Sequence, residues 1–133
     1  MKKINIYEGE VENAVFHDER GIIADVFYSA KIDHVALITS KPGVIRGNHY
    51  HKNSIQHILI TDGSLEYWFA EVNNLANSDF VVARVGDLVT SEASEVHALK
   101  ILEEGCTFIA FTEGQRGGKD YESDTFRVKN IIR

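Results

Sequence analysis

The stretch "SKPGVIRGNHYHKNSIQHILITDGS", from Ser40 to Ser64, contains three of the chain's six histidines, His49, His51 and His57. Successive side chains of a β-strand point to opposite faces, so His49 and His51 would project to one side and Tyr50 to the other. Two imidazoles on one face suit either a metal ion or proton transfer on a bound substrate. The first question is therefore whether this stretch is a strand.

The composition predicts an all-β protein. The 133 residues include 14 Ile, 12 Val and 6 Thr against 7 Leu, and β-branched residues favour strands. Short apolar runs such as "HVALIT", "QHILIT", "LEYWFAEV", "FVVARV" and "CTFIAF" recur between Gly, Asp, Asn and Ser. We expect a sandwich or barrel, built as one domain over residues 1–133.

Two connections can be predicted within this barrel. Asp62 and Gly63 separate "QHILIT" from "SLEYWF", and an Asp-Gly pair is a strong signal for a tight hairpin turn. The polar segment from Asn73 to Asp79 predicts a longer hairpin loop. The charged segment "TEGQRGGKDYESDTFRV" either folds back over the mouth of the barrel or extends as a solvated tail, and both readings stay open.

Charge and composition also exclude some functions. A net charge of −6 argues against a nucleic-acid binder that works through a basic face, and no apolar run is long enough for a membrane span. Cys106 is the single cysteine, so a reducing cytoplasmic location is expected. Trp68 and Phe69 would fall on opposite faces of one strand, which predicts a second apolar surface and a homodimer.

The spacing around the histidines resembles the first motif of the cupins, G-x5-HxH-x3-4-E-x6-G. Gly43, His49, His51 and Gly63 match it, and Gln56 stands where Glu is usual. The resemblance implies a cupin double-stranded β-helix, that is, a jelly-roll barrel, with its motifs at about residues 43–97.

The second cupin motif is matched in part. Gly86 and His97 have the expected spacing, whereas Glu92, Ser94 and Ile101 replace its usual Pro, Gly and Asn. The resemblance implies that His97 joins the pocket. His57 directly follows Gln56 and should face away from it.

A second resemblance concerns sugar metabolism. The segments "HDERGIIADVF" and "SKPGVIRGNHYH" are similar to the "DxRG" opening and the "KGVLRGLHYQ" strand of the dTDP-4-dehydrorhamnose 3,5-epimerases. The string "RGNHYHK" followed by Gln also resembles the sugar 3,4-ketoisomerases and the cupin domains of capsular polysaccharide enzymes. These resemblances imply a sugar-nucleotide ligand and an enzyme that isomerises or epimerises a keto sugar.

In this epimerase-like reading no metal is needed. His49 is the base, and the catalytic candidates are His49, His51 and Tyr50. Arg20 and Arg46 are substrate-binding candidates together with Lys52, because a guanidinium fork suits a pyrophosphate.

Two alternatives remain open. In the first, His49, His51, Gln56 and His97 hold a divalent transition metal (Zn, Mn, Fe or Ni) in an oxygenase or hydrolytic cupin. In the second, the barrel binds a sugar without turning it over.

Overall fold

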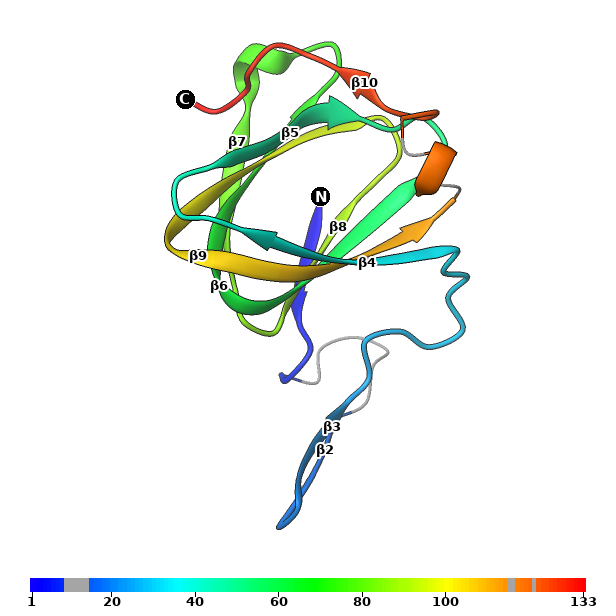
Figure 1. Ribbon diagram of the computed structural model, residues 1–133, viewed down its shortest axis with the longest axis vertical. Coiled ribbons are helices and arrows are strands. Elements are labelled where there is room, and N and C mark those ends of the chain that lie inside the picture. The colour runs from blue at the N-terminus through cyan, green and yellow to red at the C-terminus, as the bar shows by residue number, and fades with distance from the viewer. Residues whose placement is uncertain (9–14, 115–116, 121) are drawn as a thin grey trace.

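The protein is an antiparallel β-barrel, shown in Figure 1 as a computed structural model that describes residues 1–8, 15–114, 117–120 and 122–133. Its strands are β1 (Lys2–Asn5), β2 (Val15–Asp18), β3 (Gly21–Ala24), β4 (His34–Ser40), β5 (Ile45–Tyr50), β6 (Ile55–Glu71), β7 (Asp79–Arg84), β8 (Asp87–Ser91), β9 (Glu95–Glu113) and β10 (Phe126–Arg127). Short 3-10 helices cover Leu75–Asn77 and Gly118–Asp120. Within the described residues, no helix has the length and apolar character needed to cross a membrane.

The two long strands, β6 and β9, pair along their whole length and join two sheets. The first half of β6 and the second half of β9 form one sheet with β8, β1 and β4. The second half of β6 and the first half of β9 form the other sheet with β7, β5 and β10. This arrangement confirms the predicted all-β class and the jelly-roll barrel.

The predicted hairpin at Asp62 and Gly63 is wrong, because β6 continues through both residues. The pairing of β6 with β9 shifts register on either side of Asp62. Gly63 has φ +73°, and a Cβ there would lie 2.0 Å from the carbonyl oxygen of Gly105. The glycine therefore allows two strands to bend past each other where they change sheets. The predicted loop between Asn73 and Asp79 does join the paired strands β6 and β7.

The core lies between the two sheets. Its buried side chains are Ile58, Ile60, Leu65, Tyr67, Ala83, Val89, Leu99, Ile101, Cys106, Phe108 and Ala110. Burial, with the charge of Asp62 adding to it, raises the pKa of the Cys106 thiol to about 11, so this cysteine stays protonated and unreactive.

Trp68 and Phe69 face opposite sides of β6, as predicted. Phe69 packs against the core, whereas Trp68 lies in a separate outer cluster with the buried Ile131. The chain's own C-terminal segment thus covers Trp68. A partner subunit is not required to explain this apolar surface.

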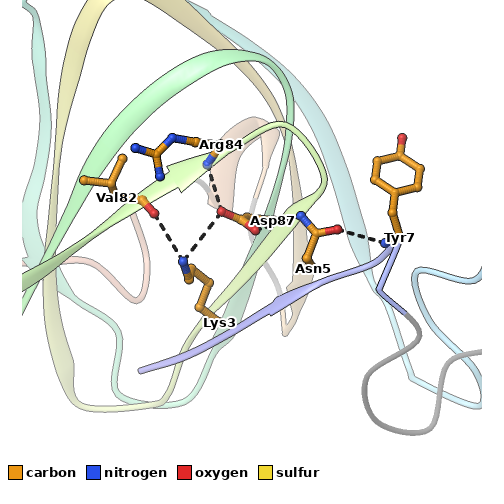
Figure 2. Close-up of polar contacts among 6 residues, drawn as sticks. All are labelled: Lys3, Asn5, Tyr7, Val82, Arg84 and Asp87. Carbon is orange, nitrogen blue, oxygen red and sulfur yellow. Dashed lines mark hydrogen bonds and ion pairs between the residues drawn. The ribbon is translucent and has the colours of Figure 1, made fainter.

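Asp87 contacts side chains of the N-terminal strand β1 and stabilises its position on the barrel (Figure 2). Its side chain is buried and accepts hydrogen bonds from Asn5 Nδ2 at 3.0 Å and from the backbone N–H of Arg84 at 2.9 Å. Lys3 Nζ lies 3.8 Å from Asp87 Oδ2 and donates to the carbonyl of Val82. These contacts hold β1 in register against β8 and fix the turn between β7 and β8.

Candidate active site

A bulge in β5 brings His49 to the interior of the barrel. Gly47 pairs with Ala98 and His49 with His97, so Asn48 is the extra residue between them. Gly47 and Asn48 both have positive φ, +86° and +58°. Gly and Asn adopt this conformation most readily, which explains why "GN" stands at the bulge.

Three imidazoles meet beside this bulge. The ring centroid of His49 lies 5.0 Å from that of His51 and 4.7 Å from that of His97, and the last two are 5.3 Å apart. One nitrogen from each ring lies within 4.8 Å of the others, and His51 and His97 are buried. The strand alternation and the motif spacing therefore placed all three side chains together, as expected.

Gln56 completes the group, because its side chain is buried and its Oε1 lies 3.3 Å from His51 Nε2. The other nitrogen of His51, Nδ1, lies 2.8 Å from the carbonyl oxygen of Asp124. A carbonyl can only accept, so Nδ1 donates to Asp124 and Nε2 of the neutral ring is an acceptor. The backbone of Asp124 thereby orients His51. A hydrogen bond between Nε2 and Gln56 therefore requires the amide to turn its NH₂ group, rather than Oε1, toward His51.

His57 faces the opposite side of the sheet, as the alternation predicts. Its Nδ1 lies 2.7 Å from Thr90 Oγ1 and its Nε2 lies 2.8 Å from Glu113 Oε2. Phe27 packs edge-on against its ring. These contacts give His57 a role in packing the outer face.

Tyr67 and Ser91 are pocket residues that the sequence did not single out. The hydroxyls of Tyr67 and Ser91 are hydrogen-bonded to each other, and the Tyr67 ring stacks beside His97 with centroids 6.1 Å apart. Burial raises the pKa of Tyr67 well above its ordinary value, against the opposing effect of the Ser91 hydrogen bond. Tyr67 therefore keeps its hydroxyl proton and is able to donate a hydrogen bond in the pocket.

His49, Gln56, Tyr67, Ser91 and His97 line a cavity of about 330 Å³ inside one end of the barrel, whereas His51 is not among the residues of its wall. The wall of the cavity combines polar and apolar residues. Its polar residues are Arg46, His49, Gln56, Tyr67, Ser91, His97, Glu122 and Arg127, and the others are Ile38, Ile45, Gly47, Ile58, Leu99 and Phe108. A concave pocket in which polar side chains converge beside an apolar wall is typical of a small-molecule site.

The C-terminal segment folds back over the mouth of this cavity. β10 pairs with β5, with Phe126 opposite Tyr50 and Arg127 opposite His49. Glu122 and Arg127 line the cavity. Of the two readings of the tail, the structure supports the folded one for residues 117–120 and 122–133, while positions 115, 116 and 121 lie outside the described residues.

The other predicted site residues lie at different places. Arg46 lines the cavity, with Nε donating to Ser40 Oγ at 2.7 Å. The Lys52 ammonium lies 4.2 Å from the ring centroid of Phe126. It is not among the residues that line the cavity.

Arg20 and Tyr50 lie outside the wall of this chain's cavity. Arg20 is exposed at the end of the β2–β3 hairpin, away from the barrel, and its guanidinium pairs with Asp18 at 2.7 Å. Tyr50 stacks on Phe126 and packs against the outer Trp68 cluster, because it points to the opposite face from His49. Packing on this outer face accounts for its position.

The barrel and its internal histidine pocket define a cupin-type jelly roll. The chain belongs to the polysaccharide biosynthesis C-terminal domain family, whose model matches residues 16–113. Comparison with curated protein sequences gives no match.

Solved structures resemble the whole barrel. A 3,4-ketoisomerase from Helicobacter canadensis is 17% identical, with a TM-score of 0.74 over 96% of this chain and 90% of that chain. The 3,4-ketoisomerase QdtA from Thermoanaerobacterium thermosaccharolyticum, solved in complex with TDP, is 16% identical, with a TM-score of 0.72 over 96% and 87%. The dTDP-4-dehydrorhamnose 3,5-epimerase from Sulfolobus tokodaii is 19% identical, with a TM-score of 0.69 over 90% and 76%. At these identities the likeness establishes the fold.

Proposed function

We propose that this protein is a cytoplasmic enzyme that isomerises or epimerises a keto sugar attached to a nucleotide. The observation that carries the proposal is that His49 and His97 line one cavity together with the hydrogen-bonded hydroxyls of Tyr67 and Ser91. The family's link to polysaccharide biosynthesis supports it. So do structural neighbours that are sugar 3,4-ketoisomerases and 3,5-epimerases, one of them solved with TDP.

The reaction begins with proton removal. His49 takes the proton from the carbon next to the ketone, and the electron pair left behind moves onto the ketone oxygen to give an enolate. Tyr67 donates a hydrogen bond to this oxygen, which stabilises the charge as it develops. Return of a proton to the same carbon from the opposite side gives the epimer. Return to the former ketone carbon moves the ketone by one position, because the neighbouring hydroxyl passes its proton to the former ketone oxygen, which becomes the new hydroxyl.

Deuterium exchange tests this proposal directly. In D₂O the wild-type protein should exchange the hydrogen beside the ketone of a TDP- or UDP-linked 4-keto sugar. His49→Asn should reduce the exchange rate by about 10² to 10⁴, which is the contribution of a general base. His57→Asn is the matched control, because His57 lies on the opposite face and exchange should continue. Absence of exchange by the wild type with every such sugar would overturn the enzyme proposal, and saturable binding without exchange would favour the sugar-binding alternative.

A metal-dependent activity is the second candidate, and the donor set favours it. Ligands around a tetrahedral ion lie about 3.3 Å apart when each metal–nitrogen bond is about 2.0 Å. His49, His51 and His97 offer nitrogens within 4.8 Å of one another, and the Gln56 amide oxygen is beside them. A small inward movement would therefore let these residues hold Zn, Mn, Fe or Ni. When bound, the ion would act as a Lewis acid on a substrate oxygen.

Metal analysis separates the two candidates. Protein purified without added metal, and then soaked with each ion and desalted, should retain about one equivalent if the metal reading holds. A His49→Ala, His51→Ala double variant should lose it. The absence of retained metal in the wild type after soaking would rule out the metal-dependent activity. The mechanism in which His49 acts as a base without a metal would then remain.

We also propose that the protein is a homodimer. The β2–β3 hairpin projects from the barrel and pairs with no other strand in the described residues (Figure 1). Phe16 and Ile23 lie directly opposite each other on it and are 62% and 64% exposed. A two-stranded hairpin with an uncovered apolar face is marginal in water, so a second copy is its expected cover.

A further inference from the structure

Arg127 is the arginine of the C-terminal segment that lines the mouth of the histidine cavity. It pairs with His49 across β10 and β5, and residues directly opposite in an antiparallel pair project to the same face. Its side chain thus starts beside the proposed base.

The backbone on both sides of Arg127 is held in place. On one side, the Asp124 carboxylate accepts hydrogen bonds from the backbone N–H groups of Lys52, Asn53 and Ser54, each at 2.9 Å. On the other side, the backbone N–H of Val128 donates to the carbonyl of Asn48 at 2.9 Å. Arg127 is therefore a long side chain attached to a fixed stretch of backbone, which is a suitable arrangement for binding a ligand.

The guanidinium of Arg127 has a partner that a ligand can replace. Its Nη2 lies 2.8 Å from Glu122 Oε1, and both side chains are more than half exposed, at 65% and 55%. Exposed ion pairs of this kind contribute little stability, so exchanging one costs little. By contrast, the guanidinium of Arg46 at the same cavity is tied to Ser40 Oγ and to the carbonyl of Thr39.

We propose that Arg127 binds the diphosphate of the ligand at the mouth of the cavity and that Glu122 occupies its guanidinium until the ligand arrives. This inference rests on the proposed nucleotide-sugar function and assigns its anion-binding residue. The planar fork of an arginine matches two phosphate oxygens, and a diphosphate offers more negative charge than the single carboxylate that it displaces. Of the described side chains that line the cavity, Glu122 supplies the one carboxylate, so the exchange also removes a charge that would repel the ligand.

Isothermal titration calorimetry tests the inference with three probes: dTDP, thymidine and inorganic pyrophosphate. Arg127→Gln should weaken binding of dTDP and of pyrophosphate by about tenfold to a hundredfold, the usual worth of a charge-assisted hydrogen bond, and leave thymidine unchanged. Arg127→Lys should recover part of the loss, because it restores the charge without the fork. Glu122→Gln should increase the affinity for both anions by about threefold.

Arg84→Gln is the matched control. Arg84 is an exposed arginine on β7 outside the cavity wall, so all three affinities should stay as in the wild type. Wild-type affinity of Arg127→Gln for dTDP and pyrophosphate would overturn the inference while leaving the proposed function intact. Pyrophosphate binding that depends on Arg127, without any binding of dTDP, would support the anion site and contradict a thymidine nucleotide as ligand. No binding of either anion by the wild type would overturn both.

Discussion

Gly47 lies directly against the backbone of His97. A Cβ atom at position 47 would be 2.8 Å from the carbonyl oxygen of His97 and 3.1 Å from the Cα atom of Ala98. This close approach of β5 to β9 is what brings the rings of His49 and His97 edge to face. The geometry of the site therefore depends on a residue that carries no chemistry.

Gly47→Ala should destabilise the protein and disturb the pocket. The variant must adopt φ +86° and also push β9 away, and we expect a loss of about 3 kcal/mol. Gly43→Ala is the matched control, because φ there is +78° but no atom lies within 4 Å of the added Cβ. Urea unfolding of both variants measures the difference. Equal losses would mean that backbone strain alone matters and that the contact with His97 does not.

The sequence predicted the histidine group partly from a local rule and partly from the motif, because His97 meets His49 through the non-local pairing of β5 with β9. Alternation along one strand puts His49 and His51 on one face, and the motif spacing added Gln56 and His97. The Asp62–Gly63 signal failed for a physical reason: a positive φ at glycine serves a hairpin turn and a bulge equally well, and the backbone of Gly105 decides between them. That contact joins residues far apart in the chain.

Non-local pairing also explains the residues that were missed. Arg127 reaches the pocket only because β10 adds to the edge of β5, opposite His49. Tyr67 lies in an apolar run whose alternation predicts an inward side chain but cannot distinguish core from cavity wall. Hydroxyl-bearing residues within or at the end of an apolar strand, as Tyr67 is in β6 and Ser91 in β8, are the signal that could have prompted a search.

Asp124→Asn should loosen the C-terminal segment and alter its acid sensitivity. Burial pushes the pKa of Asp124 up, but hydrogen bonds from Asn53, Lys52 and Ser54 push it further down, so the net pKa lies below its ordinary value of 3.8. The unfolded state therefore binds this proton first as the pH falls. The stabilisation is complete above the unfolded pKa and is lost as the pH falls through the folded one.

Urea midpoints at neutral pH and at about pH 3 measure this effect. The variant should lose about 1 to 3 kcal/mol at neutral pH, because an amide cannot accept the same hydrogen bonds with a full charge. It should also lack the part of the acid destabilisation that Asp124 causes. An unchanged difference between the two pH values would show that this carboxylate is not responsible.

Ile23→Ser should convert a dimer to a monomer if the β2–β3 hairpin is its interface. Light scattering after size-exclusion chromatography gives the molecular mass of each variant. Val85→Ser is the control, because Val85 is also exposed, at 47%, but lies in the turn between β7 and β8. A monomeric wild type, or a dimer that Ile23→Ser leaves intact, would contradict this interface.

Tyr67→Phe should reduce turnover far more than it reduces stability. The substitution keeps the ring beside His97 and removes the hydroxyl that we expect to donate to the enolate oxygen. Loss of one such donor typically costs about 10² to 10³ in kcat. Deuterium exchange on the keto sugar measures the rate, and urea unfolding measures the stability, which should change by about 1 kcal/mol for one lost hydrogen bond. Ser91→Ala keeps the donor and removes its buried partner, so its rate should fall less than that of Tyr67→Phe. If Tyr67→Phe exchanged deuterium at the wild-type rate, another group would have to stabilise the enolate, and the role of Tyr67 would be confined to packing beside His97.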